Sequence, residues 1–308
     1  MHFSIVKINP EDALPSHGFD DAIFPLYYAL ASLGFEVEIL FNRVNTESRN
    51  IVFGSCIAPR RVSRMLPPGS IVFNLEQLGV QGSKWVGEHY LAHLRTFTVW
   101  DYSAANIAAL REAGVADAVH VPLGYVPEMT RLKADFLTDV DALFYGLITD
   151  RRHELIQRLL AAKIHTLVSQ EAFGSLRDRL LAHSRLVLNI HQFLPARLEV
   201  VRLSYAWANK KPVLSEKRND TFIPEHLAEA CVFSPYDDIP EAAASLLADK
   251  ARLSKQGETG FRAFSSRLMT DELEKIVGRR AHAFAPPAAA LQNEDYYIRP
   301  VREWLIEK

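Results

Sequence analysis

The chain has 308 residues, of which 48% are hydrophobic and 23% charged, and a formal net charge of −2. Its pI of about 6.6 argues against a nucleic-acid-binding domain, because the basic surface of such a domain usually raises the pI above about 9. Its two cysteines, Cys56 and Cys231, lie far apart in the sequence and match neither a disulfide framework nor a zinc motif. This cysteine usage is typical of a reducing compartment.

Targeting segments are not expected in this sequence. The first residues, MHFSIVKINPEDALPSHGFDD, contain no basic region followed by an apolar run of signal-peptide length. No stretch of about 18 apolar residues occurs that would cross a membrane as a helix. We therefore expect a cytoplasmic protein.

The first third of the chain alternates short apolar runs with helical patterns, which is typical of a parallel sheet covered on both faces. Acidic residues open its first helix and Gly34 follows the end of that helix, as helix termini favour. The predicted strands are His2–Ile8, Glu36–Phe41, Ile51–Phe53, Ser70–Asn74, Phe97–Trp100 and Ala118–Val121, and the predicted helices are Phe19–Leu33 and Ser103–Glu112.

After a connector around Glu128–Thr138 the same alternation begins again. A tail follows, with a hinge at Ala283–Ala289 and a terminal helix over Glu294–Lys308. The second set of predicted strands is Asp141–Tyr145, Ile164–Val168, Leu186–Ile190, Pro212–Ser215 and Cys231–Phe233. The second set of predicted helices is Asp150–Ala162, Ser175–His183, Leu198–Ala208, Ile239–Leu247 and about Ala251–Ser266.

This pattern predicts an α/β fold with two Rossmann-like, doubly wound domains that face each other across a cleft. The domains are expected at 1–126 and 139–270, with the tail at 271–308. Open parallel sheets bind ligands at the carboxyl ends of their strands, so the loops after the strands are the places to look for chemistry.

Two arginines follow a glycine at the first such loop of the second domain. The strand Asp141–Tyr145 ends at Gly146, and the next helix opens with Arg151 and Arg152. Cations at a helix N-terminus oppose its dipole, whereas a bound phosphate there would account for both of them. The alternative is that both arginines are solvated and Asp150 caps the helix.

Polar residues also end the strand Leu186–Ile190 and begin the helix after it. Asn189 and His191 lie at the expected ligand edge, and His191 is either a phosphate or hydroxyl ligand or a histidine satisfied by the backbone. Glu199, Arg202 and Tyr205 share one face of the following helix. Glu199 offers two acceptor oxygens to sugar hydroxyls, or it forms an ordinary helix salt bridge with Arg202.

The segment Leu203–Val213, followed by Leu214-Ser215-Glu216, resembles group-1-type glycosyltransferases of the GT-B fold. The turn Ala208–Val213 matches the turn of that family, with Lys210 where glycine is usual. Gly146 with the two arginines resembles the opening of its second domain, and Tyr236–Ile239 resembles the region after its donor-site strands. The pattern is most similar to the spore-maturation-protein-like glycosyltransferases, and the resemblance covers about 140–265.

The resemblance implies that a nucleotide-diphosphate sugar binds the second domain without a cofactor or a metal. Many relatives carry two glutamates eight positions apart on the donor-site helix; these fall here near Arg197 and Tyr205, so we expect Glu199 to take their role. The Asp139–Asp141 pair has the Asp-x-Asp form of metal-dependent enzymes, but it precedes a strand and lies at the wrong edge. The expected donor-binding residues are Gly146, Arg151, Arg152, Asn189, His191, Glu199, Arg202 and Tyr205.

The first domain is then expected to face the acceptor. His17, Asp20 and Glu76 are candidates for the general base that removes the proton of the acceptor hydroxyl. Asp20 is alternatively a residue that complements the helix dipole, and Glu76 a carboxylate that stabilises its loop. Gly124 and Tyr125, just before the connector, are expected to line the cleft.

The function that the sequence favours is transfer of a sugar from a nucleotide-diphosphate donor to an acceptor hydroxyl. The acceptor would be a glycan, a lipid-linked glycan or a protein, with no nucleic acid as partner. A lipid-linked acceptor would add peripheral contact with a membrane. Two alternatives stay open: a nucleotide-sugar 2-epimerase of the same fold, and a non-catalytic module that binds a nucleotide or a sugar.

Overall fold

The structure is a computed structural model in which residues 2–10, 14–58, 65–79, 86–132, 138–192 and 197–279 are described. The chain divides into two compact units, one of Met1–Val126 with Leu268–Lys308 and one of Pro127–Arg267. Helix α10 (Met269–Val277), which the sequence did not predict, therefore belongs to the first unit. The expected hinge at 283–289 and the terminal helix at 294–308 lie outside the described residues.

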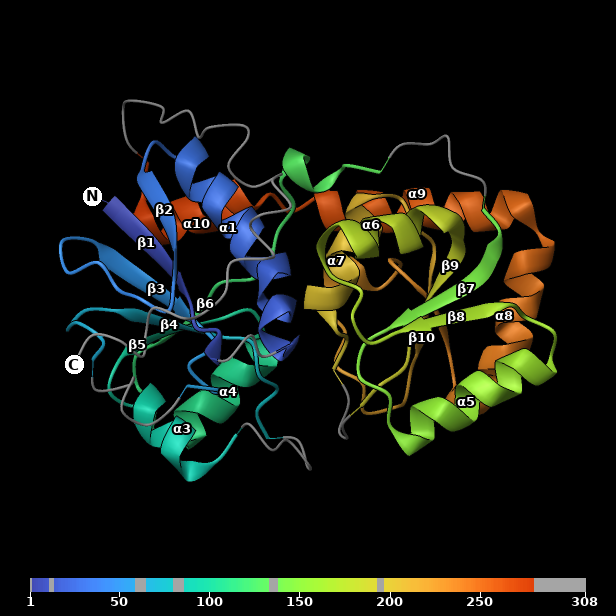
Figure 1. Ribbon diagram of the computed structural model, residues 1–308, viewed down its shortest axis with the longest axis horizontal. Coiled ribbons are helices and arrows are strands. Elements are labelled where there is room, and N and C mark those ends of the chain that lie inside the picture. The colour runs from blue at the N-terminus through green and yellow to red at the C-terminus, as the bar shows by residue number, and fades with distance from the viewer. Residues whose placement is uncertain are drawn as a thin grey trace. The chain divides into compact units, whose positions relative to one another are not determined.

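The first unit contains a sheet whose neighbouring strands are all parallel, in the order β2-β1-β3-β4-β5-β6 (Figure 1). The strand order reverses between β1 and β3, which makes this the switch point of a doubly wound sheet. Its strands are β1 (His2–Lys7), β2 (Glu36–Phe41), β3 (Arg49–Phe53), β4 (Ile71–Asn74), β5 (Thr98–Asp101) and β6 (Ala118–His120).

Helices cover this sheet. The longest of them, α1, packs against β2 and against α10, and α4 packs against β5 and β6. The described helices of the first unit are η2 (Leu14–Phe19), α1 (Asp20–Ser32), α3 (Glu88–Leu94), α4 (Ala104–Glu112) and α10. Ile23, Leu26 and Leu30 recur on one face of α1 and are fully buried, which explains why this segment is helical.

Helix α10 is docked by residues that the sequence had placed at the cleft. The amide of Met269 donates to the carbonyl of Tyr125 at 3.0 Å. A Cβ on Gly124 would lie 2.6 Å from the amide nitrogen of Met269, so only glycine lets the two segments approach so closely. Gly124 and Tyr125 thus join the end of the first sheet to α10, and nothing in these contacts assigns them to a ligand.

The second unit contains a parallel sheet in the order β11-β10-β9-β7-β8, with its switch point between β7 and β9 (Figure 1). The strands are β7 (Val140–Tyr145), β8 (Thr166–Ser169), β9 (Ser184–Asn189), β10 (Val213–Glu216) and β11 (Val232–Ser234). The helices are η3 (Pro127–Met129), α5 (Asp150–Ala161), α6 (Gly174–His183), α7 (Val200–Ala208), η4 (Glu225–Leu227), η5 (Tyr236–Asp238), α8 (Ile239–Ala248) and α9 (Lys250–Ser265).

The two faces of this sheet are covered by different helices. Ala142 and Phe144 of β7 belong to one apolar core with residues of α5 and α8. Tyr145 points to the opposite face, where its hydroxyl donates to the carbonyl of Arg202 in α7 at 2.8 Å. Because both faces are buried, the strands read as continuous apolar runs rather than as alternating patterns.

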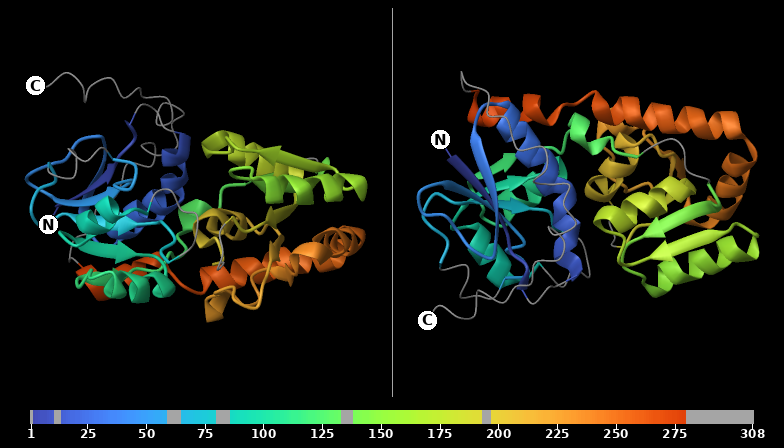
Figure 2. Two further views of the ribbon diagram at one scale, coloured as in Figure 1. Left: turned by 90° about the horizontal axis from the view of Figure 1, so that it is seen from below. Right: turned by 45° about the horizontal axis from the view of Figure 1, so that its top comes forward.

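The long helix α9 runs beside α7 (Figure 2). Gly257 and Gly260 of α9 face the turn after α7 and Trp207, at positions where a Cβ would collide. In that turn Lys210 has a φ of 56°. This is the left-handed region that favours glycine, and the resemblance places a glycine at this position.

Candidate functional site

The candidate site lies at the carboxyl edge of the second sheet, at its switch point. Here the loop after β7 leads into α5, the loop after β9 begins at Ile190, and β10 ends at Glu216. Loops after adjacent parallel strands meet at one edge, so residues far apart in the sequence come together. The sequence-predicted residues found in this cluster are Gly146, Arg151, Arg152, Asn189, His191, Glu199 and Arg202.

Glu199 is the carboxylate at the centre of the cluster. It is the N-cap residue of α7 rather than part of its first turn, because its backbone is not yet helical. Its Oε2 accepts from the side-chain amide of Asn189 at 2.7 Å and from Nδ1 of His191 at 3.0 Å, and its Oε1 lies 3.9 Å from Arg152. Burial alone would raise the pKa of Glu199, but the charge and hydrogen bond of His191 lower it to about 2.

His191 is held from two sides. Its backbone amide donates to Oε2 of Glu216 at 3.0 Å, and its Nδ1 carries the proton toward Glu199, because a carboxylate can only accept. Burial would lower the pKa of His191, but the attraction of Glu199 and the hydrogen bond to it raise it. The other ring nitrogen, Nε2, is buried and has no hydrogen-bond partner in the described part of the chain.

Arg152 has a structural role. Its side chain is fully buried, and it donates to the carbonyl of Ile190 from Nε at 2.9 Å and from Nη2 at 2.7 Å. Nη1 donates to the carbonyl of Leu147 at 2.8 Å. Burial, together with the nearby positive charge of Arg202, lowers the pKa of Arg152 to about 9. Arg152 therefore clamps the loops after β7 and β9 together, and its donors are taken up by the protein.

Arg151 is paired with Glu216, a residue to which the sequence analysis gave no role. Both Nη groups of Arg151 donate to the carboxylate of Glu216, which is fully buried at the end of β10. The guanidinium also lies over the ring of Tyr236, 3.9 Å from its centroid. Glu216 could have been recognised in the sequence as a candidate site residue, because it is an acidic residue at the carboxyl end of an apolar strand.

Arg202 is the arginine of the cluster with donor capacity to spare. Its Nη1 is buried and has no hydrogen-bond partner among the described residues. A Cβ on Gly146 would lie 3.2 Å from Cζ of Arg202, and Gly146 has a φ of 137°. Glycine at this loop therefore leaves room for the guanidinium next to the backbone.

The charges of the cluster do not cancel. Its cationic groups outnumber its carboxylates by four to two when His191 is protonated. The excess positive charge and the unpaired donors Nε2 of His191 and Nη1 of Arg202 suit a bound anion. The cations are Arg151, Arg152, His191 and Arg202, and the carboxylates are Glu199 and Glu216.

Tyr205 does not belong to this cluster. Its buried ring contacts the guanidinium of Arg177, 3.5 Å from the ring centroid, and its hydroxyl accepts from Nε of Arg131 at 3.1 Å. These contacts join α7 to α6 and to the connector, so the structure gives no support for a role of Tyr205 in donor binding.

In the first unit, Asp20 is committed to an ion pair. Both of its oxygens accept from Nζ of Lys7, at 2.8 and 2.9 Å, and both side chains are buried. Nδ1 of His17 lies 3.8 Å from the same carboxylate. Asp20 therefore neutralises a buried lysine, and it is a poor candidate for a general base.

Glu76 is the better placed of the candidate bases. It follows β4 at the carboxyl edge of the first sheet, where it accepts from the thiol of Cys56 at 3.4 Å. Burial raises the pKa of Glu76, which moves a carboxylate toward the range useful for proton transfer near neutral pH.

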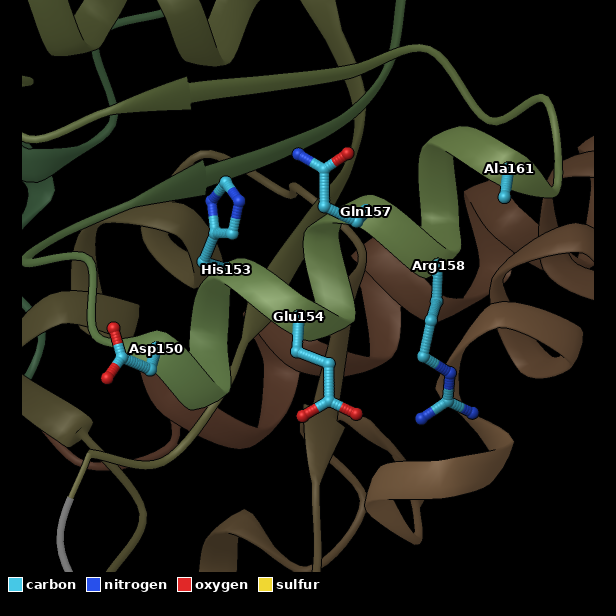
Figure 3. Close-up of a pocket in the computed structure, with 6 residues that line it drawn as sticks. All are labelled: Asp150, His153, Glu154, Gln157, Arg158 and Ala161. Atoms are coloured by element: carbon cyan, nitrogen blue, oxygen red, sulfur yellow. The ribbon is translucent and has the colours of Figure 1, made fainter.

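A separate hollow of about 580 Å³ lies along the outer face of α5 (Figure 3). The side chains that line it project from successive turns of the helix and do not converge on one point. They are Asp150, His153, Glu154, Gln157, Arg158 and Ala161. The hollow has no built ligand geometry comparable to the Glu199 cluster.

Within the described ranges, no group of three or more histidine, cysteine, aspartate or glutamate side chains has the arrangement to hold a metal ion. Asp139 pairs with His183 and Asp141 with Arg185, before and at the start of β7. None of the described helices is long and apolar enough to cross a membrane.

Comparison with known proteins identifies the fold. No family model matches the chain. The solved structures that share its fold include sucrose-phosphate synthase of Thermosynechococcus elongatus, with a TM-score of 0.60 at 13% identity. They also include WaaG, a glycosyltransferase involved in lipopolysaccharide biosynthesis, with a TM-score of 0.55 at 11% identity, and TarM, with a TM-score of 0.52 at 11% identity. The chain has the GT-B fold.

The extent of these matches differs. The alignment with the synthase covers 89% of this chain and 98% of the synthase. The alignment with WaaG covers 90% of this chain and 100% of WaaG. The alignment with TarM covers 75% of this chain but only 54% of TarM. Among curated proteins, protein L140 of Acanthamoeba polyphaga mimivirus is 26% identical over 186 residues. That match covers 58% of this chain, and the chain spans 59% of the length of L140.

Proposed function

We propose that the chain is a glycosyltransferase that binds a nucleotide-diphosphate sugar at the carboxyl edge of its second sheet. One observation carries the proposal: at the switch point of a doubly wound sheet, a buried ring nitrogen of His191 (Nε2) and a buried guanidinium nitrogen of the partly buried Arg202 (Nη1) have no hydrogen-bond partner among the described residues. A diphosphate is the leaving group of such donors, and its charge matches the excess positive charge there. The GT-B fold supports this assignment. The resemblance of the sequence to the spore-maturation-protein-like glycosyltransferases suggests the subtype.

The chemistry follows from the site. As the bond from the anomeric carbon to the diphosphate breaks, negative charge grows on the phosphate oxygens. Guanidinium and imidazolium donors in a water-poor site stabilise that charge, and we propose Arg202 as the principal guanidinium. The acceptor is a hydroxyl group of a glycan, a lipid-linked glycan or a protein, and Glu76 of the first unit is our candidate for the base that takes its proton.

Calorimetry with UDP, GDP, ADP and dTDP tests this proposal. At least one of them is expected to bind, and Arg202→Ala is expected to weaken that binding about 10- to 100-fold, because a hydrogen bond to a charged group contributes about 1.5–3 kcal/mol. Turnover is then followed as release of the bound type of nucleotide diphosphate from its nucleotide sugars.

The matched control is Arg158→Ala on α5, whose guanidinium pairs with the exposed Asp237 and lies outside the cluster. It should bind nucleotide as the unmodified chain does. Failure of all four diphosphates to bind would contradict the proposed function. Conversion of the nucleotide sugar to an epimer without any acceptor would instead indicate a 2-epimerase.

A further inference from the structure

In the structure, Glu199 has a different role from the one predicted from its sequence position. The sequence predicted that its carboxylate binds sugar hydroxyls. In the structure, Nδ1 of His191 lies 3.2 Å from Oε1 and 3.0 Å from Oε2, and Oε2 also accepts from Asn189. The side chain of Glu199 is only 11% exposed. The carboxylate of Glu199 therefore faces the imidazole, and it accepts its hydrogen bonds from side chains of the protein.

The remaining donor of this pair belongs to His191. With Nδ1 fixed by Glu199 and the backbone amide fixed by Glu216, the ring has one orientation, and its Nε2 is the buried atom without a partner in the described structure. An unpaired buried nitrogen costs free energy, so a ligand that accepts from it would be stabilised. A carboxylate that orients an imidazole by its other nitrogen is an arrangement suited to proton transfer.

We propose that His191 donates the Nε2 proton to the diphosphate as it leaves the sugar, and that Glu199 is the positioning residue that fixes its ring. This inference rests on the proposed function and goes beyond diphosphate binding, since it assigns a proton donor. His191 would be the catalytic residue because it touches the leaving group, whereas Glu199 acts through His191.

The step balances as follows. The bond between the anomeric carbon and the phosphate oxygen breaks, and its electron pair stays on that oxygen. The oxygen takes the proton from Nε2, and His191 becomes neutral, with its other proton still on Nδ1 and donated to the carboxylate of Glu199. The anomeric carbon forms a bond to the oxygen of water or of an acceptor hydroxyl, whose proton leaves to solvent or to a base. Water then returns a proton to Nε2.

Every charged group that faces His191 bears on its protonation. Glu199 and Glu216 favour the imidazolium, whereas burial and the nearby Arg151 oppose it. Arg152 and Arg202 lie in the same cluster, and their positive charges also disfavour the imidazolium form of His191. The two carboxylates prevail, so the pKa of His191 is raised above its ordinary value.

The protonation of His191 makes binding of a diphosphate depend on pH. Below the pKa of His191, Nε2 carries a proton and donates to the diphosphate. Above it, Nε2 presents a lone pair to the phosphate oxygens, and the donor is lost. Binding of a nucleotide diphosphate is therefore expected to weaken as the pH rises through this raised pKa.

The first arm of the test uses the full chain without ligand and follows the ring nitrogens of His191 by ¹⁵N NMR between pH 5 and pH 9. We expect His191 to titrate above the ordinary histidine value, and Glu199→Gln to shift its titration downward by at least about one pH unit, because the glutamine keeps an acceptor but removes the charge. The matched control, His153→Gln on the exposed face of α5, should leave it unchanged. Titration of His191 at or below the ordinary value would overturn the inference.

The second arm measures binding by calorimetry at pH 6 and pH 9, with whichever of UDP, GDP, ADP and dTDP binds. The unmodified chain should lose about tenfold in affinity over this range, and His191→Gln, whose amide donates at any pH, should lose almost none. In hydrolysis of the nucleotide sugar, His191→Gln should lower kcat about 100-fold with a small change in KM. Binding that is equally strong at both pH values overturns the inference and leaves the proposed function standing, whereas no binding at all overturns both.

Discussion

Replacing Arg152 by methionine is expected to lower the free energy of unfolding by about 3–5 kcal/mol, because removing one partner from a buried ionic network leaves the others uncompensated. The carbonyls of Ile190 and Leu147 would lose their donors, and both are held by this one guanidinium. Glu199 would lose a nearby positive charge while it stays buried. Methionine fills much of the same volume, so the loss reports the polar contacts rather than a cavity.

Urea unfolding followed by circular dichroism measures this loss. The control is Arg158→Met on the same helix, since its ion pair with the exposed Asp237 should contribute less than about 1 kcal/mol. If the two variants lose the same amount, the interpretation of Arg152 as a clamp between two loops is wrong. The Arg152 variant is also expected to bind nucleotide more weakly, because the loop that carries His191 would no longer be fixed.

The fold was largely predictable from local patterns. The strand predicted at Ser70–Asn74 was identified correctly, as Ile71–Asn74, because buried parallel strands are short apolar runs, and the glycines after helices mark the ends of those helices. The two sheets of the GT-B fold confirm the predicted architecture. Helices α3 and α10 were missed because each buries only two apolar residues, Tyr90 and Leu94 in α3 and Met269 and Leu273 in α10. Neither has the run of strong helix formers, four alanines in nine residues, that made α4 recognisable at the same length as α10.

The site was predictable in its location but less so in its roles. Topology alone brings the loops after β7 and β9 together, which is why Asn189, His191 and Arg202 were identified as neighbours. Spacing does not say which side chains become buried. Arg151 and Arg152 are adjacent in sequence, yet the side chain of Arg151 is 32% exposed to solvent whereas that of Arg152 is fully buried. The pairing of Glu199 with His191 depends on where α7 begins, and the sequence placed that start two residues too early.

Gly257 is the second position where a small change should have a large effect. A Cβ at this position of α9 would lie 2.1 Å from the carbonyl oxygen of Lys210, far inside any real contact. That carbonyl belongs to the backbone of the turn after α7, where the amide of Lys210 donates to Trp207 and the amide of Lys211 donates to Ala206. Because the turn cannot move without breaking these bonds, α9 would have to shift away from α7.

Gly257→Ala is therefore expected to lower the free energy of unfolding by about 3 kcal/mol, the upper end of what overpacking usually costs, although alanine is the better helix former. The control is Gly18→Ala, where an added Cβ meets nothing within 4 Å and the change should stay within about 0.5 kcal/mol. Urea unfolding of both variants measures the difference. An equal or greater stability of the Gly257 variant would mean that α9 does not press on the turn at Lys210, and the close approach of α7 and α9 would then have to be given up.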